Sequence, residues 1–256
     1  VQQLVKNHVR RLYSWNIKNG AAIVINNETK AVEAYIGSAD FNNPEDGGQV
    51  DGIRAVRSPG STLKPLLYAL AFDEGLITPN TIVTDVPINF SGYRPENFDE
   101  KFNGNVTIEE ALAESLNVPA VKILHQLEIH PFVTKLVEAN FSQIERDRNK
   151  LGLSVALGGC GVNLQELSNL YSAYANEGRF SNLKWLQENE DTSGIQLMTP
   201  GAAFMLTEIL TQLTRPDMPK NWQGTKNLPK VAWKTGTSYG RRDAWSIGYN
   251  KKYTVG

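Results

Sequence analysis

Cysteine and histidine are scarce in this sequence, which holds one cysteine, Cys160, and three histidines among 256 residues. A single cysteine excludes an internal disulfide and any metal site built from several cysteines. None of the histidines belongs to a His-x-x-x-His pair, so we expect no metal site. Cys160 itself is predicted to be a small buried side chain rather than a nucleophile.

The sequence also lacks an excess of charge of either sign and any long apolar run. Lysine and arginine total 26, aspartate and glutamate total 27, and the formal net charge is −1. This balance lacks the basic footprint of nucleic-acid binding, so we expect no nucleic-acid partner. No apolar run approaches the ~20 residues that span a bilayer, and no signal peptide is visible. We interpret the chain as a soluble piece of a longer protein.

What the sequence does contain is enough apolar material, 41% of its residues, for one large domain or two lobes. Runs of strand character lie near both ends of the chain. These strands are expected at 21–25, 31–37, 231–238, 244–249 and 253–256. Patterns of helical character fill much of the remainder. These helices are expected at 1–15, 66–72, 107–114, 120–127, 163–178 and 200–214.

Strands at both ends of a helical middle predict a mixed α+β fold. We place a sheet lobe at about 16–72 plus 195–256 and an all-helical lobe at 73–194. Residues 78–106 are rich in proline, asparagine and glycine and are predicted to form a long irregular connection. The last strand runs to Gly256 with no closing element, so we expect the domain of residues 1–256 to be truncated at its C-terminal end.

Ser61 and Lys64 are the first candidates for chemistry. Ser61 is expected at or just inside the start of a buried helix, where free backbone N–H groups favour negative charge. Lys64 lies three residues later on the same helical face. A nucleophile with a potential base beside it is the simplest arrangement for covalent catalysis. A second Ser-x-x-Lys match, Ser181 with Lys184, means that this spacing alone does not identify the site.

The order of three motifs separates the two matches. Ser61-x-x-Lys64 is followed by Ser115-Leu116-Asn117 and then by Lys234-Thr235-Gly236, whereas no Ser-x-Asn stands between Lys184 and Lys234. Only Ser61 therefore begins a complete set. This ordered combination is typical of penicillin-binding proteins and class A β-lactamases.

Longer segments around these motifs resemble the transpeptidase domain of class A (bifunctional) high-molecular-weight penicillin-binding proteins. They are residues 57–65, 93–99, 111–120 and 234–238. Residues 157–161 and 241–245 are most similar to the 1C subgroup of that class. The resemblance runs from about residue 20 to the end of the chain. It implies the fold shared with serine β-lactamases, an antiparallel sheet flanked by helices with an all-helical lobe.

The resemblance also implies a role for each motif residue and requires no cofactor. Ser61 attacks the peptide carbonyl, Lys64 accepts its proton, and Ser115 relays a proton to the leaving amine. The backbone of the substrate peptide is bound by Asn117. Lys234 supplies a second positive charge. Thr235 and Thr237 bind the terminal carboxylate, and the backbone N–H groups of Ser61 and Thr237 form the oxyanion hole. Gly236 leaves the strand without a side chain where the substrate must lie close.

The role of Lys64 makes a demand that can be checked against physical chemistry. A lysine with a pKa of about 10.4 is charged at neutral pH and cannot accept a proton. Service as a base requires that its pKa fall by about three units, roughly 4 kcal/mol. Burial and a neighbouring positive charge, for which Lys234 is the candidate, both lower the pKa of an amine.

The implied activity is a D,D-transpeptidase that cross-links peptidoglycan stem peptides through an acyl-enzyme on Ser61 and is inhibited covalently by β-lactams. A non-catalytic penicillin-binding sensor, a serine β-lactamase and a D,D-carboxypeptidase remain open alternatives. The β-lactamase is disfavoured because no Glu-x-x-Leu-Asn match is present, the nearest, Glu114 to Asn117, being one residue short. A Ser-His-Asp hydrolase is disfavoured because Ser61 does not stand in the Gly-x-Ser-x-Gly motif of such enzymes.

The expected partners are stem peptides and β-lactams, and the sequence names no protein partner. By resemblance, a membrane anchor and a glycosyltransferase domain belong to the parent protein outside this chain. Contact with the membrane would occur only through those parts. The expected location is the periplasm or the extracytoplasmic face of the bacterial inner membrane.

Overall fold

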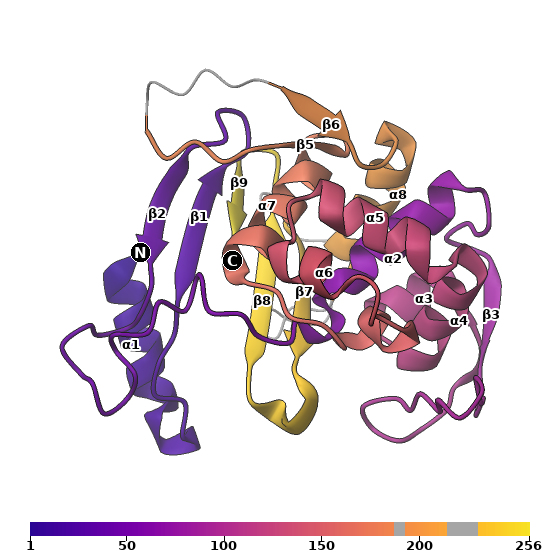
Figure 1. Ribbon diagram of the computed structural model, residues 1–256, viewed down its shortest axis with the longest axis horizontal. Coiled ribbons are helices and arrows are strands. Elements are labelled where there is room, and N and C mark those ends of the chain that lie inside the picture. The colour runs from indigo at the N-terminus through magenta and orange to yellow at the C-terminus, as the bar shows by residue number, and fades with distance from the viewer. Residues whose placement is uncertain (187–192, 214–229) are drawn as a thin grey trace.

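The computed structural model describes residues 1–186, 193–213 and 230–256. A five-stranded antiparallel sheet with the strand order β2-β1-β9-β8-β7 is its organising element (Figure 1). The strands are β1 Ala22–Asn26, β2 Val32–Ile36, β7 Ala232–Thr237, β8 Ala244–Tyr249 and β9 Tyr253–Val255. Alternate side chains are buried, as Ile23 and Ile25 in β1 illustrate, which is the pattern of a half-covered sheet. The predicted fold class is confirmed.

Helices cover one face of this sheet and extend beside it as a second mass (Figure 1). They are α1 Gln2–Leu12, α2 Lys64–Asp73, α3 Ile108–Ala113, α4 Asn117–Leu127, α5 Ile129–Glu138, α6 Ser142–Asp147, α7 Leu164–Ala175 and α8 Pro200–Thr211. Each residue of α2 from Lys64 to Phe72 is buried, so α2 is a core helix that packs on α4 and α8. Among the described residues, no helix has both the length and the apolar character needed to cross a membrane.

Helix α7 joins the two masses, because it packs on β1, β8 and β9. Its Tyr171 and Tyr174 form an aromatic cluster with Tyr249 of β8, with ring centroids 5.0–6.2 Å apart. The Asn163 side chain accepts the N–H of Glu166, and the Glu166 carboxylate accepts the N–H of Asn163. The two bonds form a complete capping box at the start of the helix. The proposed boundaries between the sheet lobe and the helical lobe, at residues 72/73 and 194/195, stay a prediction.

Two short sheets lie in segments for which no strands were predicted. Strand β3 (Ile82–Asp85) pairs with β4 (Gly104–Thr107) inside the segment expected to be irregular, and β5 (Arg179–Ser181) pairs with β6 (Gly194–Gln196). The region expected to be all-helical is therefore mostly helical. Strands of three or four residues are too short to show an alternating pattern, and pairing with a distant segment defines them.

Helix α4 begins at Asn117, three residues before the predicted start at 120. The prediction treated Pro119 as an interruption. Pro119 occupies the first turn of α4, where its missing N–H removes no helical hydrogen bond. This places Asn117 at the first position of the helix.

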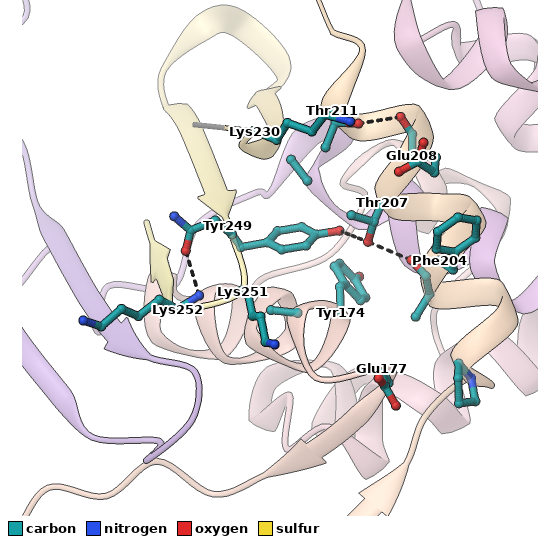
Figure 2. Close-up of a pocket in the computed structure, with 15 residues that line it drawn as sticks. Tyr174, Glu177, Phe204, Thr207, Glu208, Thr211, Lys230, Tyr249, Lys251 and Lys252 are labelled. Carbon is teal, nitrogen blue, oxygen red and sulfur yellow. Dashed lines mark hydrogen bonds between the residues drawn. The ribbon is translucent and has the colours of Figure 1, made fainter. Parts of the chain in front are cut away.

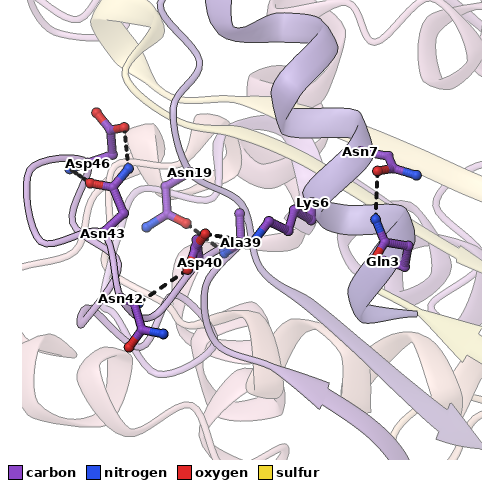
Figure 3. Close-up of polar contacts among 9 residues, drawn as sticks. All are labelled: Gln3, Lys6, Asn7, Asn19, Ala39, Asp40, Asn42, Asn43 and Asp46. Atoms are coloured by element: carbon purple, nitrogen blue, oxygen red, sulfur yellow. Dashed lines mark hydrogen bonds and ion pairs between the residues drawn. The ribbon is translucent and has the colours of Figure 1, made fainter.

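Helix α1 is held by polar contacts more than by burial, since only Val9 of its residues is buried. Figure 3 shows Lys6 of α1 reaching Asp40 in the loop after β2, with Nζ and Oδ2 2.7 Å apart. Asn19 accepts the N–H of Ala39 at 2.9 Å and fixes the same loop to the segment after α1. These contacts lie at the end of the sheet where β1 begins and β2 ends.

We predict that Asn163→Ala lowers the free energy of unfolding by about 1 kcal/mol, because it removes the N-cap of α7. Gln165→Ala on the same turn is the control, since the Gln165 side chain has no hydrogen bond within the described residues and alanine is a good helix former. Urea unfolding of both variants measures the difference. An equal stability for Asn163→Ala and the parent would contradict the role given to the cap.

Candidate active site

One cleft of about 980 Å³ brings residues of all three motifs together. Its walls include the turn before α2, the junction of α3 and α4, and strand β7. The motif residues that line it are Ser61, Ser115, Asn117, Thr235, Gly236 and Thr237. Lys64 and Lys234 lie beneath this surface and are buried. The predicted site residues are therefore neighbours in space, and their chemical roles stay a prediction.

Ser61 lies in a 3₁₀ turn, η2 (Gly60–Leu63), that runs directly into α2. This agrees with its predicted place at or just inside the start of a helix. The residue is half-buried and lines the cleft. Its hydroxyl has no hydrogen-bond partner in the part of the chain that the structure describes, so it is available to a ligand in the cleft.

Two glycines allow the Ser61 turn to touch β7 backbone to backbone. Gly60 has φ +55°, and a Cβ on it would lie 2.4 Å from the carbonyl oxygen of Thr237. A Cβ on Gly236 would lie 2.3 Å from the carbonyl oxygen of Pro59. We expected Gly236 to leave room for a substrate, but a side chain there would first meet the turn that carries Ser61. The glycine is required for packing within the protein.

The segment around Gly158 supports the same turn from another side. Gly158 has φ +89°, and a Cβ on it would lie 2.4 Å from the nitrogen of Gly60. The hydroxyl of Ser58 donates to the Gly158 carbonyl at 2.8 Å, and the Trp245 indole N–H donates to the Ser58 carbonyl at 2.8 Å. These contacts explain why segments 157–161 and 241–245 matter, although they contain none of the three motifs. In the sequence, the adjacent glycines at 158–159 were the signal for this close approach of two backbones.

The Lys64 amine is fully buried and is surrounded by oxygen acceptors. Its Nζ donates to the carbonyl oxygens of Ser115 at 2.6 Å and Leu116 at 3.0 Å and to Oδ1 of Asn117 at 2.7 Å. Burial, and then the positive charge of Lys234, hold the pKa of Lys64 well below its usual value. The three acceptors suit an ammonium group, but within the described residues no carboxylate forms an ion pair with it. We therefore give burial the greater weight.

Lys234 approaches the same serine from β7. Its Nζ donates to Oγ of Ser115 at 2.8 Å and to the carbonyl of Thr235 at 3.1 Å. Burial lowers the pKa of Lys234 to about 8. Ser115 thus accepts a hydrogen bond from each lysine, one on its carbonyl and one on its hydroxyl. It does so with φ +59°, a left-handed conformation that costs a serine about 1 kcal/mol or more.

Asn117 is held on every side by the protein. Its N–H donates to Oδ1 of Asn97 at 2.7 Å, its Nδ2 donates to the Glu96 carbonyl at 2.7 Å, and its Oδ1 accepts from Lys64. One hydrogen of Nδ2 remains for a substrate. Residues 93–99 carried part of the resemblance but were given no chemical role, and two of them, Glu96 and Asn97, hold Asn117 in the structure.

The remaining candidates lie away from this cleft. Ser181 belongs to β5 and Lys184 forms a bridge to Ala31, and neither residue lines the cleft. Cys160 packs partly buried against the core, and burial raises the pKa of its thiol to about 12, which fits the predicted inert side chain. Among the described residues, no cluster of three or more histidines, cysteines or carboxylates could hold a metal ion.

A second cavity, of about 730 Å³, lies between α8 and the end of β8 (Figure 2). Phe204 and Thr207 of α8 and Tyr249 of β8 line it, and the Thr207 and Tyr249 hydroxyls are hydrogen-bonded at 2.9 Å. The described residues that line this cavity include no member of the three motifs. We therefore assign the chemistry to the motif-lined cleft.

Comparison with known proteins gives the same family as the ordered motifs. The family model described as penicillin binding protein transpeptidase domain matches residues 20–255. Penicillin-binding protein 1C of Escherichia coli K12 is 40% identical over 239 residues, which are 92% of this chain and 30% of that relative. Penicillin-binding protein 1F of Bacillus subtilis 168 is 31% identical over 92% of this chain and 34% of that relative. The chain thus spans about a third of the length of these curated relatives.

Solved structures share the fold at lower identity. The PonA1 protein of Mycobacterium tuberculosis, solved in complex with penicillin V, gives a TM-score of 0.78 at 19% identity, over 99% of this chain and 73% of that chain. The transpeptidase domain of penicillin-binding protein 3 of Burkholderia pseudomallei gives 0.78 at 20% identity, over 99% and 84%.

We predict that Gly236→Ala lowers the free energy of unfolding by about 1–3 kcal/mol, because the added methyl forces Pro59 and β7 apart. Gly201→Ala in α8 is the matched control, since the nearest atom to its added Cβ is 3.8 Å away and alanine favours the helix. Urea unfolding distinguishes the two. If both variants were as stable as the parent, β7 and the Ser61 turn would not be in contact.

Proposed function

The chain belongs to the penicillin-binding protein transpeptidase family, and we propose that it acylates Ser61 with a D-Ala-D-Ala stem peptide and passes the acyl group to the amine of a neighbouring stem. The observation that carries this proposal is the contact of Ser115 with both buried lysines in the cleft that Ser61 lines. That contact places the low-pKa amine of Lys64 and the hydroxyl of Ser115, the proposed proton relay, beside the cleft that holds the proposed nucleophile.

In the acylation step, Oγ of Ser61 bonds to the carbonyl carbon of the peptide and its proton passes to the neutral amine of Lys64. The lowered pKa of Lys64 keeps that amine available, and the three oxygens around it receive the ammonium that forms. The C–N bond then breaks, and the departing D-Ala nitrogen takes its proton through the hydroxyl of Ser115. Lys234 keeps that hydroxyl in place.

The negative charge that develops on the carbonyl oxygen needs donors. The backbone N–H groups of Ser61 and Thr237 are proposed for this role, and each such donor contributes about 2.7–4 kcal/mol in comparable sites. The close approach of Gly60 to the Thr237 backbone supports this pairing. Thr235 and Thr237 are exposed on β7 and are proposed to bind the terminal carboxylate, beside the charge of Lys234.

The acyl group leaves Ser61 by the reverse of this route. An amine of a second stem loses its proton to the same base, attacks the acyl carbon and forms the cross-link. Water in place of the amine would give carboxypeptidation, and a β-lactam would acylate Ser61 without a departing group. We place this reaction outside the cytoplasm, on peptidoglycan, with the membrane contacted only through other parts of the parent protein.

We predict that a labelled penicillin modifies Ser61 alone, since this serine begins the only complete motif set and lines the cleft. Ser61→Ala should lose all labelling while remaining folded, and Ser181→Ala should label at the parent rate. Peptide mapping by mass spectrometry identifies the modified residue. Label on Ser181, or none on the parent, would overturn the proposed acyl-enzyme.

Release of D-Ala from a stem peptide separates an enzyme from a non-catalytic sensor, because acylation by penicillin requires the same residues in both. We expect the parent chain to release D-Ala and Ser61→Ala to release none. A parent chain that binds penicillin but releases no D-Ala would be a sensor.

The acylation rate should fall at alkaline pH with a midpoint near pH 8. Lys234 loses its proton there, and with it the positive charge that lowers the pKa of Lys64 and strengthens the hydrogen bond to Ser115. Lys234→Arg retains a charge at all accessible pH values, so it should move this alkaline limb above pH 10 even if it slows acylation.

Lys30→Met is the matched control for this profile. Lys30 is a second buried lysine whose pKa burial lowers to about 8, but it bonds Asn169 on α7 and does not line the cleft. Its replacement should leave the alkaline limb near pH 8. An unchanged limb in Lys234→Arg would contradict the assignment.

A further inference from the structure

We propose that Asp85 is a positioning residue, which fixes the side-chain amide of Asn97 and thereby holds Asn117 and the amine of Lys64 in place. This inference rests on the proposed function of the Ser61 cleft. None of the three motifs includes Asp85 or Asn97. Both belong to the segment between α2 and α3 that the sequence predicted to be an irregular connection.

The Asp85 carboxylate is fully buried at the end of β3 and serves only as an acceptor. Its Oδ1 accepts from Nδ2 of Asn97 at 2.9 Å. Its Oδ2 accepts from the same Nδ2 at 2.8 Å, from the Asn103 N–H at 2.9 Å and from Nδ2 of Asn103 at 2.8 Å. No lysine or arginine of the described residues forms an ion pair with it. A buried group that only accepts, from N–H donors alone, has the bonding of an ionised carboxylate.

This carboxylate determines which way the Asn97 amide points. The NH₂ group of Asn97 faces two acceptors, Asp85 and the carbonyl of Lys101, the latter at 2.8 Å. The amide oxygen must then face the other way, where it accepts the N–H of Asn117 at 2.7 Å. Asn97 is only 4% exposed, so water cannot replace these partners freely.

The link continues from Asn117 to the reacting centre. Asn97 holds the backbone of Asn117, and the adjacent carbonyl of Glu96 holds its side-chain NH₂. The side-chain oxygen of Asn117 is thereby directed at Nζ of Lys64. The two residues before Asn117 supply the other two acceptors of Lys64, and one of them, Ser115, has strained backbone geometry. A fixed start of α4 is what keeps all three acceptors around the amine.

The identity of residue 85 matters because an asparagine, which has the same shape, would replace one acceptor oxygen by an NH₂ donor. If the new amide oxygen took the Oδ2 position, where it keeps the bonds from Asn103 and one bond from Asn97, its NH₂ group would take the Oδ1 position and oppose the NH₂ group of Asn97. Asn97 would then turn over to present its oxygen, and its NH₂ would oppose the N–H of Asn117. The bond that holds the start of α4 would be lost without any change in volume.

The experiment measures how fast, and how completely, a labelled penicillin acylates the full chain carrying Asp85→Asn. We expect the acylation rate constant to fall about 10- to 100-fold, the effect of misplacing a reacting group by a fraction of its working distance. The final stoichiometry should remain one label per chain. A variant that was merely less well folded would instead lose label stoichiometry and keep the parent rate constant in its folded fraction.

Asn103→Ala is the matched control, because Asn103 also donates to Asp85 but makes no bond toward Asn117. It should change the rate constant by less than twofold. Asn97→Ala, which removes the link and leaves Asp85 bound to Asn103, should slow acylation as Asp85→Asn does. If Asp85→Asn fails to fold, Asn97→Ala decides the question.

The exchange variant, Asp85→Asn combined with Asn97→Asp, tests the donor and acceptor pattern itself. The carboxylate at 97 accepts from both the new amide at 85 and the Asn117 N–H but cannot donate to the Lys101 carbonyl. This variant should therefore recover part of the acylation rate constant, at least fivefold over Asp85→Asn. A parent rate constant in both Asp85→Asn and Asn97→Ala would overturn the inference. Failure of the parent chain to be acylated would instead overturn the proposed function.

Discussion

The burial of two lysine amines around one serine is the constraint on which the rest of this structure depends. An isolated ammonium group is costly to bury, and within the described residues neither Lys64 nor Lys234 has a carboxylate partner. Carbonyl, amide and hydroxyl oxygens from two separate segments, residues 115–117 and β7, provide the acceptors instead. Those oxygens must remain within about 3 Å of each amine, a hydrogen-bond distance. The mutual placement of α2, the α3–α4 junction and β7 follows from this requirement.

Rigid backbone contact is the means by which the fold meets this requirement. The turn that carries Ser61 is pressed between β7 and the loop at Gly158, and the missing side chains at 60, 158 and 236 make the approach possible. Behind it, α2 is buried along almost its whole length. Ser61 thus lies on a turn that leads directly into a core helix, and it lines the cleft. Such a site binds with little reorganisation of its own groups.

Much of the site could be predicted from the sequence because motif order carries information that single motifs lack. The grouping of Ser61, Ser115 and Lys234 was predicted in this way, whereas the mixed fold was predicted from the runs of strand and helix character. Other features depend on contacts between distant segments, which leave no local pattern. The pairing of β3 with β4 and the grip of Asn97 on Asn117 are of this kind. The packing of Gly236 against Pro59 is also of this kind, because a sequence does not show which face of a strand a glycine presents.

The two edges of the five-stranded sheet differ in what they offer to another chain. Beyond β2, Lys184 bonds the backbone of Lys30 and Val32, and Trp185 packs edge-on against Tyr35, so that edge is already occupied. The other terminal strand is β7, which borders the cleft. A terminal strand offers its backbone to any extended peptide that lies alongside it. An extended peptide in the cleft would therefore be able to pair with β7 through its main chain, as a sixth strand of this sheet.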